Sequence, residues 1–336
     1  MKALIYKGPW EMTLEDVAEP TPNPGEVLID VKAIGICGSD VHGYTGSTGR
    51  RWPGMIMGHE FAGVVAGVAD DVSDCAVGDE VVVSPMFSVS PTPEKIPMNW
   101  SPHRRLLGVE VNGAFADRVT VKASQLFAKP AELSWQQAAL CEPLAVAMHA
   151  VQITPMDIMT DVAIIGSGTI GLLVLLAAKL KGAGRVIVID KMARRLEMAK
   201  QLGADITINA GEQNAVEAVR ELTGGGVDVT LEAVGYSATA QQAIDITRNG
   251  GNVTWIGNSA KMIEINMQSV VTREITVRGT YAFTDYEFGK SIQAMASGRI
   301  DVQPLIEKVA PLAEGPAYFK QLASGEIDLV KVVLEP

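Results

Sequence analysis

Two short clusters within the first sixty residues contain the side chain types that bind zinc. Cys37 and His42 stand at the ends of the sequence CGSDVH, and His59-Glu60 follows a glycine. Thiolate, imidazole and carboxylate groups are the protein ligands of zinc, and a catalytic zinc keeps one position open for substrate. Alone, Cys37 is compatible with a small buried hydrophobe, and His59-Glu60 with a hydrogen-bonded core pair. Both clusters lie among turn-forming glycines, where loops carry function. Together they favour a metal site.

A third cluster, GSGTIG at residues 166–171, follows a short apolar run and precedes a helical apolar pattern. Gly166 permits a tight turn, Gly168 lets the backbone approach a pyrophosphate, and Gly171 allows a helix to pack on a strand. The phosphates then bind the free N–H groups at the start of the helix, around Thr169 and Ile170. Such a motif alone is weak evidence for a dinucleotide site.

The context of the glycines strengthens this interpretation. A second apolar run, residues 185–189, ends in Asp190, about 20 residues after the glycines, where an acidic residue binds ribose hydroxyls. A 2′-phosphate at about 4 Å would be repelled by roughly 4 kcal/mol at an effective dielectric constant of 20. The sequence therefore predicts NAD rather than NADP. Lys191 or Arg195 could reduce this repulsion, and we expect Arg195 against the adenine.

The composition limits the possible partners and the compartment. The 336 residues suggest about two domains, and 28 basic against 39 acidic side chains give a net charge of −11. This charge argues against nucleic acid and anionic membranes as partners. Three cysteines form no disulfide framework, and neither a signal peptide nor a membrane span is evident. We expect a cytoplasmic protein. The basic pairs 50–51 and 104–105 are expected to be solvated.

The first half of the chain has the pattern of a β-rich domain. Strands are expected at residues 27–33, 61–68, 80–84 and 113–121, separated by proline and glycine clusters. Residues 86–107, which include Pro91, Pro93, Pro97 and Pro102, predict a long irregular loop. The spacing becomes helical from Ser134, a plausible N-cap, to about residue 151.

From about residue 161 to 280, strands and helices alternate. Strands are expected at residues 163–165, 186–189, 227–232, 252–256 and 275–278, and helices at 172–180, 193–202, 215–222 and 238–246. This alternation predicts a parallel sheet with right-handed crossovers. The tail after residue 286, with one helix and a few short strands, is too small to fold alone. We expect it to rejoin the N-terminal domain.

With these motifs the chain resembles the zinc-dependent medium-chain dehydrogenase/reductase family, and within it the polyol (sorbitol-like) and threonine dehydrogenases. The matching segments occur in the family's order: residues 37–42, 58–63, 77–79, 142–144, 166–171 and 232–235. The resemblance implies an α/β fold. A GroES-like β-rich catalytic domain would comprise residues 1–150 and 285–336. A Rossmann NAD-binding domain with a doubly wound parallel sheet, residues 151–284, would be inserted between them.

The resemblance also implies roles for individual residues. Cys37, His59, Glu60 and Glu142 match positions that bind or surround the catalytic zinc, and whether each glutamate binds directly or through water stays open. Two further sets are implied. The proton relay would consist of Ser39 and His42, and the cofactor would also contact Val234 and Gly235. Cys141, one residue out of register, is expected to pack, and Cys75 to be structural.

The chain departs from its relatives in two places. Residues 86–107 contain Glu94 and His103 but no cysteine, where many family members hold a structural zinc with four cysteines. We therefore expect one catalytic zinc per chain and no structural zinc. Ala282-Phe283 replaces an arginine–tyrosine pair typical of sorbitol dehydrogenases. The pocket linings considered are Tyr44, Arg50, Trp52, Phe115 and Phe283, and Arg50 or Arg51 could bind a carboxylate.

The predicted activity is zinc- and NAD-dependent oxidation of a secondary alcohol, a polyol, sugar or sugar acid, to a ketone. The expected partner is this small-molecule substrate, and the resemblance suggests a homodimer or homotetramer. Two alternatives remain open at this point: a zinc-free quinone or enone reductase of the same superfamily, and a non-catalytic dinucleotide-binding protein.

Overall fold

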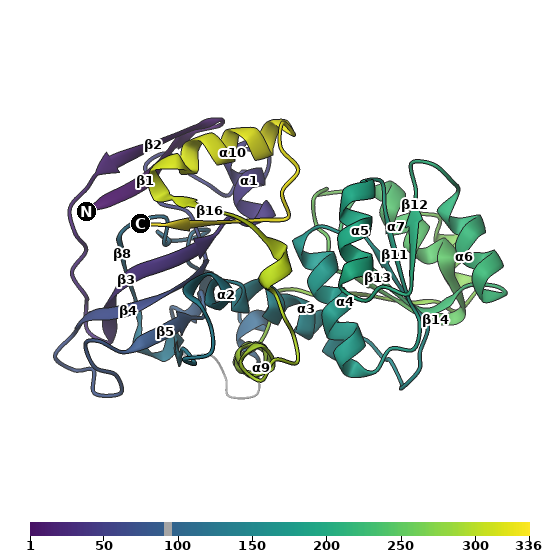
Figure 1. Cartoon of the computed structure of the whole chain (residues 1–336), viewed down its shortest axis with the longest axis horizontal. Coiled ribbons are helices and arrows are strands. Elements are labelled where there is room, and N and C mark those ends of the chain that lie inside the picture. Colours follow the sequence, from purple (N-terminus) through teal and green to yellow (C-terminus); the bar gives the residue numbers. More distant parts are fainter. Residues whose placement is uncertain (91–95) are drawn as a thin grey trace. The chain divides into compact units, whose positions relative to one another are not determined.

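The computed structural model describes residues 1–90 and 96–336 (Figure 1). Pro91, Pro93 and Glu94, named above, lie outside the described residues. The chain divides into two compact units: Met1–Glu142 with Thr284–Pro336, and Pro143–Phe283. The first boundary lies earlier than the expected 150/151, at the start of helix α3 (Cys141–Ile153). The carbonyl of Cys141 accepts a hydrogen bond from Ser291 of the first unit, and later turns of α3 belong to the second unit.

The first unit is built on a sheet with the strand order β16-β17-β3-β4-β5-β9, in which β8 also pairs with β3. Its strands are β3 (Glu26–Gly35), β4 (Glu60–Val68), β5 (Glu80–Val83), β8 (Arg118–Lys122), β9 (Leu126–Ala128), β16 (Ile306–Pro311) and β17 (Lys331–Glu335). A hairpin of β1 (Lys2–Gly8) and β2 (Glu11–Asp16) stands beside it. Its core includes Phe61, Phe115 and Phe319, all almost fully buried.

The C-terminal tail completes this unit, as the sequence predicted. Strand β17 pairs antiparallel with β3, and Val333 stands opposite Gly35. Strand β3 is buried along most of its length. Its backbone N–H and C=O groups therefore need hydrogen-bond partners on both sides. The tail contains two helices rather than one, α9 (Asp285–Ala296) and α10 (Gly315–Ser324).

Two local predictions need correction. Residues 86–107 are not wholly irregular, because β6 (Met86–Ser88) pairs with β7 (Arg104–Leu106) and a 3-10 turn, η1 (Met98–Trp100), lies between them. The helix expected from Ser134 is two helices, α2 (Trp135–Ala139) and α3. The predicted cap is confirmed, since Ser134 Oγ accepts a hydrogen bond from the N–H of Gln137 at 3.1 Å.

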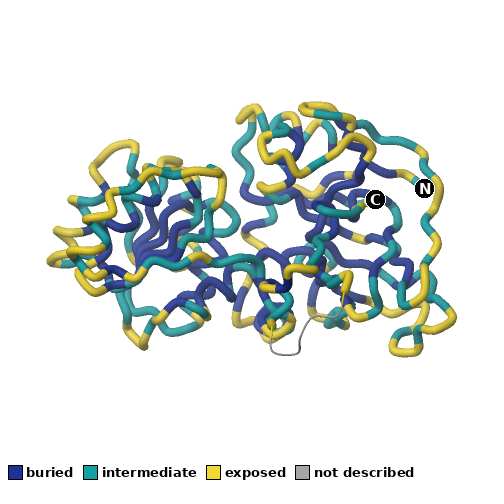
Figure 2. The backbone as a smooth tube through the Cα atoms, turned by 180° about the vertical axis from the view of Figure 1, so that it is seen from behind, coloured by how far each residue is buried: buried dark blue, intermediate teal, exposed yellow. Residues whose placement is uncertain are grey.

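The second unit contains a six-stranded parallel sheet with the order β12-β11-β10-β13-β14-β15. The strands are β10 (Val162–Ile165), β11 (Val186–Asp190), β12 (Ile206–Asn209), β13 (Val227–Glu232), β14 (Thr247–Trp255) and β15 (Thr276–Gly279). The helices are α4 (Thr169–Lys181), α5 (Ala193–Gln201), α6 (Ala215–Thr223), α7 (Ser237–Ile246) and α8 (Met267–Val271). Buried strands run through the middle of this unit (Figure 2). Strand β12 was not predicted from the sequence.

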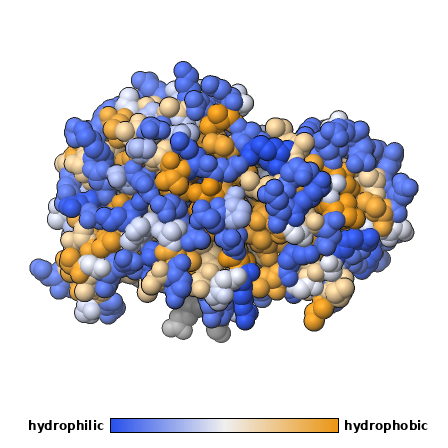
Figure 3. Space-filling view, in the orientation of Figure 1, coloured by the Kyte–Doolittle hydropathy of each residue, from blue (hydrophilic) through white to orange (hydrophobic). Residues whose placement is uncertain are grey.

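This strand order is that of the Rossmann fold, which confirms the predicted fold class. The order reverses between β10 and β13, and ligands bind such sheets at the carboxyl ends of the strands beside this reversal. The hydrophilic side chains that cover most of the face in Figure 3 are interspersed with hydrophobic ones. None of the described helices is both long and apolar enough to cross a membrane.

Candidate active site

The pairing of β3 with β4 brings together the two sequence clusters that contain candidate zinc ligands, residues 37–42 and 59–60. Gly35 at the end of β3 stands opposite Glu60 at the start of β4. Cys37 follows two residues after Gly35, and His59 immediately precedes Glu60. The ligand atoms of Cys37, His59 and Glu60 all lie within 4.8 Å of one another. An antiparallel register therefore places side chains that are distant in the sequence at one point.

This set fits a zinc ion chemically. It offers one thiolate, one imidazole and one carboxylate, the ligand types that zinc prefers. Glu60 is fully buried, and its Oε1 atom has no hydrogen-bond partner. An unsatisfied buried polar group costs about 1–3 kcal/mol, and more when it is charged. A bound cation would remove this cost.

The carboxylate of Asp40 faces the Nδ1 atom of the His59 ring. Its Oδ1 atom lies 3.4 Å from His59 Nδ1 and 3.4 Å from Arg51 Nη2. Burial would raise the pKa of Asp40, but His59 and Arg51, with the N–H of Cys37, hold that pKa below its usual value. Metal-bound histidines usually direct their second ring nitrogen to such a carboxylate. The expectation that the pair Arg50-Arg51 is solvated is wrong for Arg51, whose side chain is only 3% exposed.

Glu142 lies in the first turn of α3 and interacts electrostatically with His59 and Glu60, but it is not one of the three residues whose ligand atoms meet, Cys37, His59 and Glu60. Burial raises the pKa of Glu142 to about 8, Glu60 adds to the rise, and His59 and Lys331 oppose it. The carboxylate of Glu60 is in turn paired with Lys331, whose Nζ lies 2.6 Å from Oε2. Burial would lower the pKa of Lys331, but Glu60 and Cys37 raise it. The groups beside Cys37, His59 and Glu60, namely Glu142 and Lys331, are thus both buried and ionisable.

Helix α1 (Gly38–Tyr44) carries the two residues predicted to form a proton relay. Cys37 is its N-cap, so Ser39 and His42 stand three residues apart on one helix and face the same side. Ser39 is exposed, and its Oγ donates a hydrogen bond to Cys37 Sγ at 3.3 Å. Burial lowers the pKa of His42. Ser39 therefore stands beside one candidate metal ligand, and the role of both residues stays a prediction.

In the second unit, the three glycines of the GSGTIG motif differ in what surrounds them. Gly166 has φ +93°, which favours glycine. A Cβ on Gly171 would lie 1.8 Å from the carbonyl oxygen of Gly166, whereas one on Gly168 would meet only Arg195 Nη1, at 3.6 Å. The structure thus explains Gly171 by packing and leaves open space beside Gly168. Thr169 and Ile170 begin α4, with their N–H groups at its start.

Asp190 and the turn at Val234-Gly235 lie at the carboxyl ends of β11 and β13. Asp190 accepts hydrogen bonds from the N–H groups of Ser167 at 2.6 Å, Lys191 at 2.7 Å and Met192 at 2.9 Å. It therefore links β11 to the glycine-rich turn that follows β10.

The turn after β13 is stabilised by hydrogen bonds to Glu232, a residue for which the sequence suggested no role. Buried Glu232 accepts hydrogen bonds at Oε1 from the N–H groups of Val234 at 2.9 Å and Gly235 at 2.8 Å. An acidic residue at the end of an apolar strand was the available signal. A Cβ on Gly166 would lie 2.7 Å from Val234 Cγ2, so the two turns are in contact.

Most of the residues considered as substrate-pocket linings pack inside the protein. Tyr44 is buried and its hydroxyl donates to the carbonyl of Trp10 at 2.7 Å. Phe115 contacts Phe319 edge to face, and Phe283 is fully buried. Arg50 pairs with Glu110. Trp52, 44% exposed, is the aromatic candidate that stays accessible.

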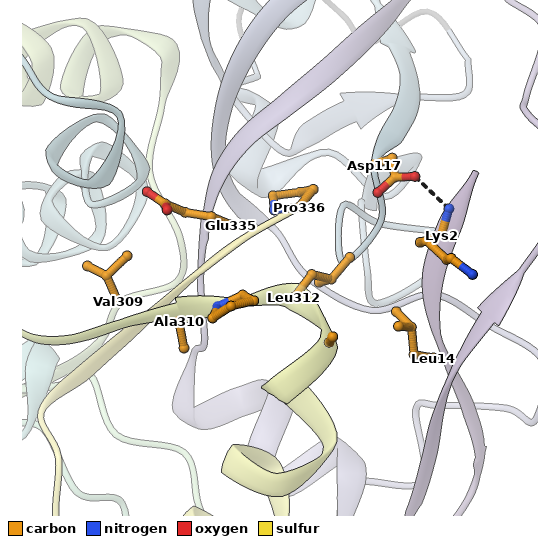
Figure 4. A pocket seen from close by; sticks show the side chains of 10 residues that line it. Lys2, Leu14, Asp117, Val309, Ala310, Leu312, Glu335 and Pro336 are labelled. Carbon is orange, nitrogen blue, oxygen red and sulfur yellow. Dashed lines mark hydrogen bonds between the residues drawn. The ribbon is translucent and has the colours of Figure 1, made fainter.

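A separate cavity of about 390 Å³ lies in the first unit among residues of β1, β16 and β17 (Figure 4). Its polar groups are already paired: Lys2 N–H donates to Asp117 Oδ2 at 2.6 Å, and Lys2 Nζ contacts Asp16 at 2.6 Å. Its lining includes none of the predicted site residues. We assign it no function.

Comparison with known proteins agrees with this geometry. Residues 23–131 match the alcohol dehydrogenase GroES-like domain, and residues 169–297 match the zinc-binding dehydrogenases. The chain belongs to the zinc-dependent medium-chain dehydrogenase/reductase family. The sorbitol dehydrogenase of Bacillus subtilis (strain 168) is 34% identical over 344 residues, which cover 100% of this chain and 97% of that protein.

Two further relatives extend the comparison. The (R,R)-butanediol dehydrogenase of the same strain is 35% identical over 321 residues, 92% of each chain. The crystal structure of 2R,3R-butanediol dehydrogenase from Bacillus subtilis superposes with a TM-score of 0.90 at 33% identity, covering 100% of this chain and 99% of that chain. The protein is therefore a dehydrogenase of the alcohol and polyol type that oxidises secondary alcohols, with zinc and a nicotinamide dinucleotide as cofactors. This confirms the predicted activity class.

Proposed function

We propose that this dehydrogenase oxidises a secondary hydroxyl group of a polyol, sugar or sugar acid to a ketone, with NAD as the hydride acceptor. The observation that supports this proposal is the grouping of partly buried Cys37 with buried His59 and Glu60, and the unsatisfied carboxylate oxygen of Glu60. A zinc-free quinone or enone reductase would have no use for these donors. A non-catalytic dinucleotide-binding protein would need neither the donors nor Ser39.

We infer that Cys37, His59 and Glu60 hold the zinc ion and that Glu142 takes part directly or through water. When bound, zinc supplies a Lewis acid that lowers the pKa of a hydroxyl group. Asp40 Oδ1 lies 3.4 Å from His59 Nδ1 and would orient the His59 ring, and the burial of His59 and Glu60 keeps bulk water away from these two donors. We expect one zinc ion per chain and no structural zinc, because residues 86–107 contain no cysteine.

Ser39 and His42 would carry the substrate proton away. Ser39 Oγ would accept the hydroxyl proton and release its own proton, which His42, three residues later on α1, would take up. The lowered pKa of His42 leaves its imidazole neutral near pH 7 and able to accept a proton. The hydride chemistry belongs to the nicotinamide. Residues around Gly166, Gly168 and Gly171 would bind the dinucleotide, with Val234 and Gly235 alongside.

The preference for NAD over NADP rests on Asp190. Its carboxylate accepts three backbone N–H groups and so is fixed in place at the end of β11. A 2′-phosphate about 4 Å away would be repelled by roughly 4 kcal/mol at an effective dielectric constant of 20. Lys191 and Arg195 lie nearby in the sequence and would offset part of this repulsion.

The proposed substrate class draws on the relatives. Sorbitol and 2R,3R-butanediol, named for two of them, both carry a secondary hydroxyl beside another hydroxyl group. We also propose a homodimer or homotetramer in the cytoplasm. The three free cysteines, Cys37, Cys75 and Cys141, are consistent with a reducing compartment.

The test combines metal analysis with a substrate screen. Purified protein should contain one zinc ion per chain and form NADH, followed by absorbance, with at least one compound among polyols, aldonates and amino alcohols. A chelator should abolish turnover while the protein stays folded, and added zinc should restore it. Two zinc ions per chain, or unfolding on chelation, would contradict the single catalytic site.

A matched pair of cysteine variants tests the donor set. Cys37 and Cys75 are both free and partly buried. Cys37→Ser should lose zinc and turnover, whereas Cys75→Ser should keep both. Normal zinc content in Cys37→Ser, or absence of NADH formation with every compound, would overturn the proposal.

A further inference from the structure

Lys331 connects the two segments that carry the metal donors. It is the first residue of β17, and its side chain is 1% exposed. Its Nζ atom donates to Glu60 Oε2 at 2.6 Å and to the carbonyl of Ile36 at 3.1 Å. Ile36 precedes Cys37, and Glu60 follows His59. A single ammonium group therefore bridges both segments.

The two oxygens of Glu60 have different surroundings. Oε2 binds Lys331 and lies 2.3 Å from the position that a Cβ on Gly35 would occupy, so only glycine leaves it room. Oε1 is buried and has no hydrogen-bond partner. Because one oxygen is fixed between Gly35 and Lys331, the other is left for a further ligand.

The backbone of β17 gives Lys331 a rigid frame. Ile36 N–H donates to the carbonyl of Val332 at 2.9 Å, and Val333 stands opposite Gly35 in the sheet. The last strand of the chain is thus bonded directly to the segment that leads into Cys37. Sites built on strands hold their side chains more precisely than sites on loops.

We propose that Lys331 is a positioning residue of the zinc site: it holds Glu60 Oε2 against Gly35, so that Oε1 faces the metal, and it fixes the Cys37 segment at the same time. This inference rests on the proposed donor set. A buried ion pair is weak evidence for stability, because apolar residues of similar size often serve as well. The unpaired Oε1 atom and the second bond to Ile36 point instead to alignment of the donors.

The test compares Lys331→Met with Lys308→Met. Lys308 is an exposed lysine on the neighbouring strand β16, opposite Val332, and is a matched control. Zinc affinity is measured by competition with a chromophoric chelator. Lys331→Met should bind zinc about 10- to 100-fold more weakly, the usual cost of losing an outer-shell partner. It should also shift the absorption bands of the cobalt-substituted protein, whereas Lys308→Met should change neither. Affinity and bands in Lys331→Met equal to those of the original protein would overturn the inference.

Lys331→Met leaves Glu60 as an unpaired buried charge and so can fail to fold. The Glu60→Gln and Glu60→Gln/Lys331→Met variants then decide, because the double variant removes both charges. If Lys331 acts mainly through Glu60, the double variant, which lacks in addition the bond to the Ile36 carbonyl, should bind zinc less than tenfold more weakly than Glu60→Gln. A further tenfold loss in the double variant would overturn the inference. Cys37→Ser separates the two proposals: if it retains zinc, the donor set itself is wrong.

Discussion

Alanine substitutions at Gly168 and Gly171 should have different consequences, although both glycines belong to one motif: the first should weaken cofactor binding and the second should lower the stability of the fold. At Gly171 a new Cβ would lie 1.8 Å from the carbonyl oxygen of Gly166 and 2.8 Å from its carbonyl carbon. Carbon–oxygen contacts normally begin near about 3.3 Å. Helix α4 and the end of β10 would therefore have to separate by about 1.5 Å. Overpacking of this kind costs about 1–3 kcal/mol, and a clash with backbone belongs at the upper end.

At Gly168 the fold should be nearly unaffected. The nearest atom to a new Cβ is Arg195 Nη1 at 3.6 Å, an ordinary contact, and φ is −72°. Alanine is a poorer N-cap than glycine by roughly 0.5–1 kcal/mol. Its lower entropy in the unfolded chain offsets this by about 0.4–1 kcal/mol. The two effects nearly cancel, so any large effect should be on the cofactor.

The expected loss at Gly168 concerns the pyrophosphate, which approaches the backbone at this glycine. Losing one hydrogen bond to a charged group costs about 1.5–3 kcal/mol. A loss of about 2 kcal/mol weakens NADH binding roughly 30-fold.

Thermal unfolding and NADH fluorescence titration separate the two cases. Gly168→Ala should keep its midpoint temperature and lose cofactor affinity, whereas Gly171→Ala should lose roughly 6–12 °C, because about 3 kcal/mol shifts a large domain by 2–4 °C per kcal/mol. A Gly168→Ala protein that binds NADH normally would refute the assigned role of this glycine. An unchanged midpoint in Gly171→Ala would refute the packing argument.

Three further outcomes are expected. Ser39→Ala should lower kcat by about 10²- to 10⁴-fold and leave the dissociation constant for NADH unchanged in a fluorescence titration; an unchanged kcat would exclude it from the relay. Asp190→Asn should raise the ratio of kcat/KM for NADP to that for NAD by about tenfold or more, because most of the roughly 4 kcal/mol of repulsion disappears, and a constant ratio would argue against the assigned role. Burial raises the pKa of Glu142 to about 8 from 4.5, so the metal-free folded protein keeps a proton that the unfolded chain releases. Its free energy of unfolding should therefore fall between about pH 5 and 8, by up to about 1.4 kcal/mol per unit; urea titrations should show this slope in the metal-free protein and not in Glu142→Gln.

Features that depend on neighbouring residues could be predicted from the sequence. The turn at Gly166 and the cap at Ser134 follow from the conformations and hydrogen bonds that these residues favour locally. The alternation of strands and helices after residue 161 predicted the parallel sheet. By contrast β12, which is short and carries polar residues, gave little hydrophobic signal, and it forms because β11 offers a free edge.

The donors Cys37, His59 and Glu60 were chosen by residue type, and only the register of β3 with β4 shows that they meet. Their supports were not foreseen. Arg51 was expected in solvent, yet it lies beside Asp40, and Lys331 drew no attention although it binds Glu60.

The sequence by itself determined the chemistry available to this protein, because thiolate, imidazole, carboxylate and glycine act through their own side chains and backbone preferences. The tertiary structure decided which charges face one another. Lys331 and Glu60 are 271 residues apart in the chain. A pairing over that separation depends on how the last strand enters the sheet, and no local pattern encodes it. Burial then gives the pair its strength, since charges interact far more strongly away from water.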